Sequence, residues 1–141
     1  MNIHGAVDID TMETTTDFAK TIDAESSHRL FKKLIAKYPE AEAIHVIVDN
    51  ASYYTSHRLK EKLEKLKGAK IVLHFLPAYS PNLNLIERLW KFFKKKILYN
   101  QYYDTFENFL SACKNFFRCR TKYRDELRTT LAENFHLFQG A

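Results

Sequence analysis

The chain has 141 residues, of which 45% are apolar and 14% aromatic, and its formal net charge is +5. This composition is too apolar for a disordered tail, and the length is enough for one substantial core, so we expect a single folded domain. No apolar stretch reaches the roughly 20 residues of a membrane helix, and the first residues show no secretory pattern. Two cysteines, Cys113 and Cys119, indicate neither a disulfide framework nor a zinc site. A reducing cytoplasm is the expected location.

Strand and helix patterns alternate in the N-terminal half. Residues 3–9 and 15–22 are predicted strands joined by a short connection, which favours an antiparallel hairpin. Asp23 or Ser26 can cap a helix whose apolar residues repeat at helical spacing up to Pro39. Residues 44–49 read as a short apolar strand of the kind found where both faces of a sheet are covered. A helix over 56–66 and a strand over 70–76 complete a right-handed parallel unit.

The C-terminal half is predicted to be helical after a proline-containing loop over residues 77–81. A helix over 83–98 has an apolar stripe, and further helices are expected over 106–117 and 123–135. The stripe is predicted to consist of Ile86, Leu89, Trp90, Phe93 and Ile97. Together these elements predict an α/β fold, with residues 1–104 forming its core and residues 105–141 a C-terminal helical extension of the same domain.

Two acidic residues stand in different contexts. Asp49 ends the apolar strand, and Glu87 lies near the start of the aromatic, basic helix. Carboxylates from different elements that converge can hold the hard divalent cations used in phosphodiester chemistry. Each also has a plainer interpretation, because a strand-final Asp is often a turn residue and Glu87 can pair with Lys91 at i+4.

Two blocks that contain these carboxylates resemble the catalytic core of DDE transposases, in the mariner-like group of bacterial insertion sequences. They are Val48-Asp49-Asn50-Ala51 and LPAYSPNLNLIERLW, which starts at Leu76. The second block is highly specific by itself, and the resemblance extends from about residue 2 to about residue 138. Ala78 and Leu85 stand where this family usually has proline.

The resemblance implies a ribonuclease-H-like mixed sheet flanked by helices. The family's first catalytic aspartate lies on a strand upstream of the segment that resembles residues 2–10. We therefore expect an N-terminally truncated domain without the first central strand, which would lie between the strands of Ile3 and Ile44. The sheet can be completed by direct closure within the chain, by self-association or by a separate N-terminal transposase fragment, and self-association is favoured.

The resemblance also implies metal-dependent DNA strand cleavage and strand transfer, with Asp49 and Glu87 as catalytic residues. In the complete family enzyme three carboxylates would hold two Mg²⁺ or Mn²⁺ ions. With two, we expect weak metal binding and no activity by this chain alone. The alternatives are a non-catalytic DNA-binding or dimerisation remnant and a stand-alone nuclease.

Lysine and arginine residues gather in three clusters, which favours DNA as a partner. The cluster after Glu87 is the most direct candidate for phosphate contact, together with Asn50 and Tyr79. The first cluster is interleaved with Glu61 and Glu64, as on an ordinary exposed helix face. The three clusters are Lys60, Lys62, Lys65, Lys67 and Lys70; Lys91, Lys94, Lys95 and Lys96; and Arg118, Arg120, Lys122 and Arg124.

Other polar residues carry weaker signals. His45 and His74 fall within predicted strands and are interpreted as hydrogen-bonded core histidines. Asp8 and Asp10 are interpreted as exposed hairpin residues rather than as a further catalytic aspartate. Asn50 has two open interpretations, since it can orient Asp49 or contact phosphate, or serve only as a turn amide.

Overall fold

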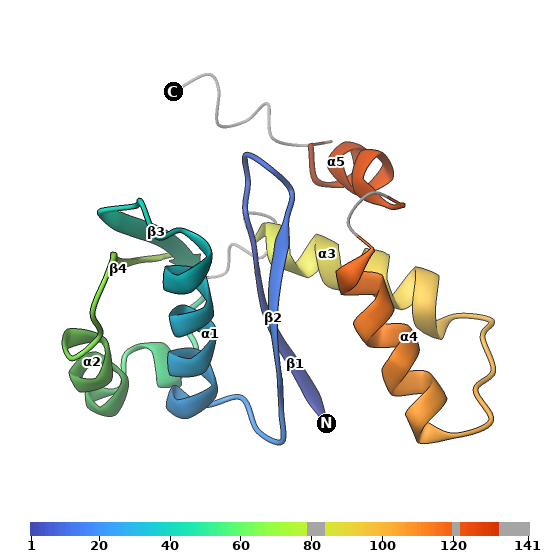
Figure 1. Ribbon diagram of the computed structural model, residues 1–141, viewed down its shortest axis with the longest axis horizontal. Helices are drawn as coiled ribbons and strands as arrows, with labels where there is room; N and C mark the ends of the chain where they lie inside the picture. Colours follow the sequence, from blue (N-terminus) through green and yellow to red (C-terminus); the bar gives the residue numbers. More distant parts are fainter. Residues whose placement is uncertain (79–83, 120–121, 133–141) are drawn as a thin grey trace. The chain divides into compact units, whose positions relative to one another are not determined.

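The computed structural model describes residues 1–78, 84–119 and 122–132 (Figure 1). The chain divides into two compact units, and each is described by itself. Unit 1 comprises Met1–Ala6 and Thr15–Asn84, and unit 2 comprises Val7–Thr14 and Leu85–Ala141. Among the described residues, no helix combines the length and the apolar character needed to cross a bilayer.

Strands β1 (Asn2–Val7) and β2 (Thr14–Ala19) form a two-stranded sheet. The first strand was predicted to run too far, because residues 8–13 form the connecting turn, and the second strand ends at Ala19 rather than at residue 22. Oδ1 of Asp8 accepts hydrogen bonds from the backbone N–H groups of Asp10 and Thr11, at 2.8 and 3.1 Å. Such side-chain bonds to the backbone compete with strand pairing. Asp8 and Asp10 are therefore turn residues of the hairpin, as expected.

Helix α1 (Ala24–Lys37) begins at a capping box. The Asp23 carboxylate accepts from the N–H of Ser26 at 2.9 Å, and the Ser26 hydroxyl accepts from the N–H of Asp23 at 2.8 Å. Two backbone donors that a helix start leaves without partners are thus satisfied. The helix ends two residues before Pro39, and its existence and start are confirmed.

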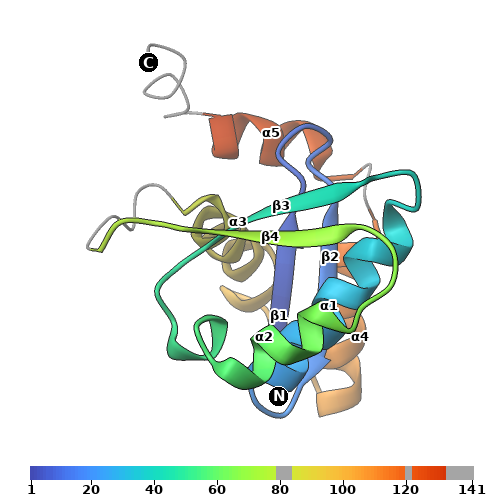
Figure 2. The ribbon, with the colours of Figure 1, turned by 90° about the vertical axis from the view of Figure 1, so that its left-hand side faces the viewer.

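Strands β3 (Ala43–Val48) and β4 (Lys70–Phe75) pair in parallel, as predicted, and lie side by side in Figure 2. Helix α2 (His57–Glu64) connects them and is capped by Ser56. Apolar residues of α1 and α2 pack against one face of this sheet. The cluster includes Phe31, Leu34 and Leu59 from the helices and Ile44, Val46, Ile71 and Leu73 from the strands.

The opposite face of the β3–β4 sheet departs from expectation. Ile47 is 55% exposed, so the prediction that both faces are covered is wrong. His45 and His74 are exposed on this sheet and lie 2.9 Å apart, Nδ1 to Nε2, so they are not core histidines. Alternation along a strand places residues 45 and 47 away from the face that the helices cover.

The fold is α/β and compatible with the ribonuclease-H-like class. Among the described residues, the strands form two separate two-stranded sheets, β1–β2 and β3–β4. The expected strands are thus present as a hairpin and a parallel pair, and the described residues show no pairing between these two sheets.

Unit 2 is built mainly from helices. Helix α3 (Leu85–Phe93) continues into a π-helical segment, Lys94–Leu98, and is followed by α4 (Phe106–Arg118) and α5 (Arg124–Ala132). The predicted helix start at Leu83 lies outside the described residues. The core of this unit consists of Leu89, Phe92, Phe93, Ile97, Cys113, Phe116, Phe117, Leu127 and Leu131.

The apolar stripe of α3 differs in part from the prediction. Ile86 and Trp90 are only half-buried, whereas Phe92, which was not selected, is buried. The Phe92 ring packs against Phe116 and Tyr123, with ring centroids 6.0 and 5.9 Å away. Helices α4 and α5 thus bury a wider sector of α3 than the narrow stripe indicated.

Candidate active site and nucleic-acid interface

Asp49 directly follows the last residue of β3 and is exposed. Its Oδ1 accepts the backbone N–H of Ala51 at 3.0 Å, which starts the turn into a short 3₁₀ helix, Ser52–Tyr54. Among the described residues, no donor binds the other carboxylate oxygen. The side chain is therefore oriented through one oxygen and open at the other.

The Asn50 side chain links the C-terminal ends of β3 and β4 by a hydrogen bond. Its Nδ2 donates to the carbonyl of Leu76 at 2.9 Å, and the N–H of Leu76 donates to the carbonyl of Val48 at 2.9 Å. This structural role supports the plainer interpretation of Asn50 as a turn amide. A contact between Asn50 and DNA stays a prediction.

A group of aromatic side chains near Asp49 was not selected from the sequence. His4 on β1 is 6% exposed, and its Nε2 lies 2.9 Å from the Tyr54 hydroxyl. The His4 and Tyr53 rings meet edge to face, with centroids 6.2 Å apart. The only available signal was a histidine within an otherwise apolar strand.

Burial is the largest cause of the pKa shifts in this group, and the Asp49 charge is a further cause for each member. Burial raises the pKa of Tyr53 and of Tyr54, and the Asp49 charge raises both further. Burial lowers the pKa of His4, although nearby carboxylates partly oppose this. Nδ1 of His4 is buried without a hydrogen-bond partner among the described residues. The Asp49 carboxylate thus lies near neutral aromatic groups.

Glu87 lies in the first turn of α3 and is exposed. A carboxylate is favoured at this end of a helix by the macrodipole. Within the described part of the chain, Glu87 forms no ion pair with Lys91, so the i+4 pair of the plainer interpretation is not observed. Tyr79 and the rest of segment 79–83, which precede Glu87 in the motif, lie outside the described residues.

The two carboxylates belong to different units, so their convergence on one ion stays a prediction. Both present exposed carboxylate oxygens, which suit hard cations such as Mg²⁺ and Mn²⁺. The described side chains contain no group of three or more His, Cys, Asp or Glu residues that could hold a metal.

The four lysines that follow Glu87 differ in whether their ammonium groups are already ion-paired or open to phosphate. Lys91, Lys94 and Lys95 are exposed and form no ion pair with any described residue. Lys96 is bound to Glu126 at 2.9 Å. Three cations on one continuous helical element are therefore open to phosphate.

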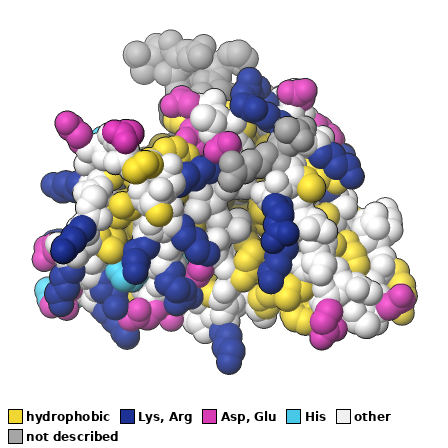
Figure 3. Space-filling model, in the orientation of Figure 1, with side chains coloured by type: hydrophobic (Ala, Val, Ile, Leu, Met, Phe, Trp, Pro, Cys, Tyr) yellow, Lys and Arg dark blue, Asp and Glu magenta, His cyan; other side chains and the backbone are white. Residues whose placement is uncertain are grey.

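The first basic cluster belongs to a different surface. On the face in Figure 3, Lys and Arg side chains gather over α1 and α2. Glu25 pairs with both Arg58 and Lys62. Their hydrogen bonds lower the pKa of Glu25, with Lys62 as the larger cause. Of the five lysines in this cluster, Lys62 is ion-paired, whereas Lys60, Lys65, Lys67 and Lys70 are exposed and form no ion pair with a described residue. The ion-paired helix face of the plainer interpretation is thus observed only in part.

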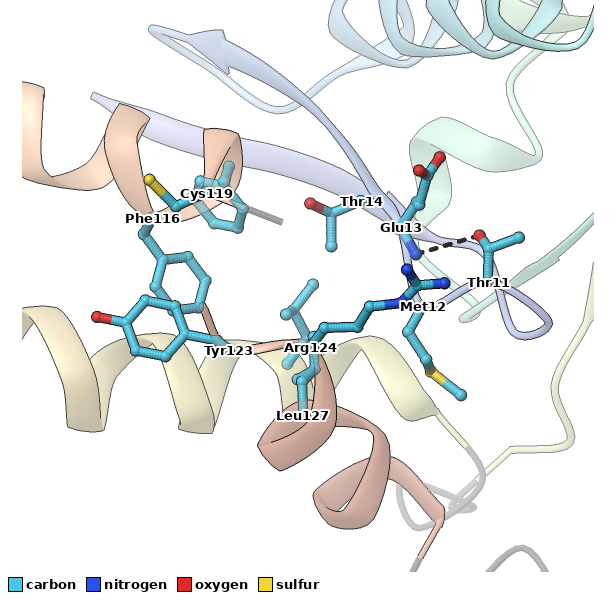
Figure 4. A pocket seen from close by; sticks show the side chains of 11 residues that line it. Thr11, Met12, Glu13, Thr14, Phe116, Cys119, Tyr123, Arg124 and Leu127 are labelled. Carbon is cyan, nitrogen blue, oxygen red and sulfur yellow. Dashed lines mark hydrogen bonds between the residues drawn. The ribbon is translucent and has the colours of Figure 1, made fainter. Parts of the chain in front are cut away.

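Unit 2 contains a pocket whose lining includes none of the predicted site residues that the structure describes (Figure 4). Its walls are mostly apolar and aromatic, with Glu13 and Arg124 as charged members. They are formed by the hairpin turn and by residues of α3, α4, α5 and the segment between the last two, including Met12, Leu89, Phe116, Tyr123 and Leu127. None of Asp49, Asn50, Glu87, Lys91, Lys94 and Lys95 lines it.

Comparisons with known proteins agree with this reading of the motifs. The chain is similar to the insertion element IS630 uncharacterized 39 kDa protein of Shigella sonnei, with 34% identity over 88 residues. The aligned region is 62% of this chain and 25% of that protein, so the chain matches about a quarter of its relative's length. The family described as DDE superfamily endonuclease matches residues 1–110, which include Asp49 and Glu87. Because that match covers more than half of the sequence, the chain belongs to the DDE superfamily endonuclease family.

Proposed function

We propose that this chain is part of the catalytic domain of a transposase of the mariner-like insertion-sequence group. Its reaction is metal-dependent DNA strand cleavage and strand transfer. The observation that carries the proposal is Asp49, an exposed carboxylate at the carboxyl end of a strand, oriented through one oxygen and open at the other. Ligands of α/β proteins commonly bind at this edge. The insertion-element relative and the family match support the same class of reaction.

Asp49 and Glu87 are proposed to hold Mg²⁺ or Mn²⁺. Such ions, when bound, supply activation of the attacking water or 3′-hydroxyl and neutralise charge on the leaving oxygen. The chain's own contribution is to fix its ligands. The N–H of Ala51 orients the Asp49 carboxylate, and Asn50 ties the strand end to Leu76. Helix α3 carries Glu87 on a rigid element.

Lys91, Lys94 and Lys95 are proposed to bind the DNA backbone beside Glu87. All three are exposed and lie on α3 or its π-helical continuation. Phosphate contacts of this kind position DNA without reading its sequence. Duplex binding should therefore show little sequence preference and strong salt dependence.

Two carboxylates should not support appreciable strand transfer by the 141 residues alone. Loss of a third ligand would forfeit most of the transition-state stabilisation that a charged site provides. Robust Mg²⁺-dependent cleavage by the purified chain, abolished by Asp49→Ala, would contradict this part of the proposal. A third ligand would then exist within the chain, and Asp8 or Asp10 would be the first residues to test.

Metal binding tests the assignment of the two carboxylates. In Mn²⁺ titrations followed by electron paramagnetic resonance, Asp49→Asn and Glu87→Gln should each weaken binding about tenfold, because each removes one charged ligand. The matched control is Glu40→Gln, which removes an exposed carboxylate from the turn after α1 and should leave the affinity unchanged. Equal affinities for all three variants and the parent chain would refute the assignment.

Charge reversal tests the DNA face. The triple change Lys91→Glu, Lys94→Glu and Lys95→Glu should weaken duplex binding at low salt by at least about a hundredfold and reduce the salt slope by about three. The control carries the same charge change on the other basic cluster, at Lys60, Lys65 and Lys67. A greater loss in the control than in the first variant would move the DNA face to unit 1.

A further inference from the structure

His45 and His74 meet on the face of the β3–β4 sheet that the helices leave open. Nδ1 of His45 lies 2.9 Å from Nε2 of His74, and the two ring centroids are 5.1 Å apart. Both residues are exposed, and we refer to them as the histidine pair. Because water could bond to each exposed ring equally well, the hydrogen bond between them contributes little by itself. Two metal-binding side chains are nevertheless held in direct contact.

The two parallel strands fix the position of the histidine pair. In their register Ile47 lies opposite His74 and Val72 lies opposite His45, so the two imidazoles are diagonal neighbours across β3 and β4. The other face of both strands packs against α1 and α2. Because the backbone that carries both rings is already ordered, a ligand that binds both rings loses little entropy in fixing them.

The spacing of the two nitrogens suits neighbouring ligands of one metal ion. An imidazole nitrogen binds a divalent ion such as Zn²⁺ at about 2.0–2.1 Å. At these bond lengths, two nitrogens on one ion are roughly 2.9 Å apart for a right angle at the metal and roughly 3.3 Å apart for a tetrahedral angle. The observed 2.9 Å agrees with the right angle, which belongs to square-planar or tetragonal Cu²⁺ and Ni²⁺ sites.

The protons of the histidine pair also permit a metal. One of the two facing nitrogens donates the hydrogen bond and the other accepts it. When a metal ion enters, the donating ring loses that proton to water and takes one up at its other nitrogen, so no net proton is released. Both facing nitrogens then offer lone pairs, and the exposed rings can turn to direct them at one ion.

The surroundings of the histidine pair select a transition-metal ion over Mg²⁺ or Ca²⁺. By alternation, the open face carries Ala43, His45 and Ile47 from β3 and Lys70, Val72 and His74 from β4. These six residues include no carboxylate, and the cation Lys70 lies roughly 13 Å along the strand from His74. Among the described residues, neither Asp49 nor any other His, Cys, Asp or Glu joins the pair as a third ligand. Imidazole suits Cu²⁺, Ni²⁺ and Zn²⁺, whereas Mg²⁺ and Ca²⁺ require oxygen ligands.

We propose that the histidine pair is a chelating site for a divalent transition-metal ion, with Cu²⁺ or Ni²⁺ preferred and water in the remaining coordination positions. The bound ion links β3 to β4 on their open face and so stabilises the strand pair. The inference is independent of the proposed function, because it uses neither Asp49 nor Glu87 and takes an ion of different chemistry.

Calorimetric titration of the chain with Ni²⁺ tests the inference. His45→Gln and His74→Gln should each weaken Ni²⁺ binding by about a hundredfold, because a single imidazole remains and the chelate is lost. The matched control, His57→Gln, removes a histidine whose side chain is 85% exposed on α2, and it should keep the affinity. In electron paramagnetic resonance of the Cu²⁺ complex, coupling to two ring nitrogens in the parent chain should fall to one in either variant of the pair. Circular dichroism verifies that all variants are folded.

Three results would overturn the inference. One is an equal Ni²⁺ affinity in the parent chain and both variants of the pair. Another is a loss confined to one of these two variants, since a chelate needs both rings. The third is an equal loss in the His57→Gln control. The Mn²⁺ binding proposed for the two carboxylates should be unchanged in His45→Gln, so failure of one metal site can be distinguished from failure of the other.

Discussion

Two buried polar residues of unit 1, Asp17 and His4, differ in how many of their polar atoms have hydrogen-bond or ion-pair partners. Asp17 is 5% exposed, and its carboxylate contacts Arg29 and Lys33 at 3.1 and 2.9 Å. His4 has a partner at Nε2 and, among the described residues, none at Nδ1. A buried ring with one unsatisfied nitrogen is costly to protonate, since a second charge-bearing N–H would also need a partner.

The stability of the chain should therefore fall in mild acid through His4. Burial lowers the pKa of His4 in the folded state, so the unfolded chain binds this proton more readily. The contribution to the free energy of unfolding is present above about pH 6.5 and is lost as the pH falls below that value, through the folded-state pKa. The charged groups nearest the ring are Asp17, Asp49, Arg29 and Asp23.

Urea unfolding midpoints measured between about pH 5 and pH 8 check this prediction. His4→Asn should remove part of the acid-dependent loss, whereas the control His57→Asn should not, because the His57 side chain is 85% exposed. A parent chain whose midpoint rises on acidification through this range would show the opposite sign and contradict the prediction.

At the scale of elements, the sequence was most informative where a local signal decides the structure. The Asp23–Ser26 capping box predicted the start of α1, and strand-helix-strand spacing predicted the parallel pairing of β3 and β4. Strand ends at the hairpin were less predictable, because Asp8 side-chain bonds end the pairing early. Nothing in three consecutive lysines indicates a π-helical turn, which depends on how α3 packs.

The same contrast holds for the candidate site. Asp49 and Glu87 were selected because they lie in blocks that resemble one family, of which the Glu87 block is the specific one, and their catalytic role stays a prediction. His4 and Tyr54 were missed because their contact joins segments far apart in the sequence. The exposure of Tyr99 and Tyr102 was not predicted, because exposure depends on tertiary packing. Whether a strand face is covered also cannot be read from a continuous apolar run alone, as Ile47 shows.

The turn between α2 and β4 offers a test of packing between elements. Gly68 has a φ of +102°, and an added Cβ would lie 2.7 Å from Cγ2 of Ile35 on α1. Gly68→Ala should lower the free energy of unfolding by about 1–3 kcal/mol, through backbone strain and this clash. In an Ile35→Ala background the clash is absent, so urea unfolding should show a smaller cost for the same change. Equal costs in both backgrounds would attribute the whole effect to the backbone.

At the scale of the whole molecule, the described strands form two sheets of two strands each, and this arrangement bears on self-association. Small sheets are marginal by themselves, and open strand edges present unpaired N–H and C=O groups. Each such group costs roughly 1–3 kcal/mol if it is buried without a partner.

We therefore predict that the chain self-associates. Sedimentation velocity over a range of protein concentrations should show a growing dimer population, and backbone amides of β1 or β3 should exchange more slowly as dimer forms. A monomer at all concentrations, with the same exchange rates throughout, would contradict this prediction.

The π-helical segment should allow the chain to lose one residue there without disturbing the core. Its Tyr99-to-Lys94 hydrogen bond spans five residues, where an α-helix would span four, so this turn holds one residue more than the pitch of α3 requires. Deleting Lys95 would let the turn rewind to α-helical spacing while Phe93 and Ile97 keep their places in the core. The surplus residue thus lies on the solvent side of the turn, within the lysine run. The number of positive charges in the lysine run can therefore vary by one without shifting α3 or the loop that begins at Tyr99.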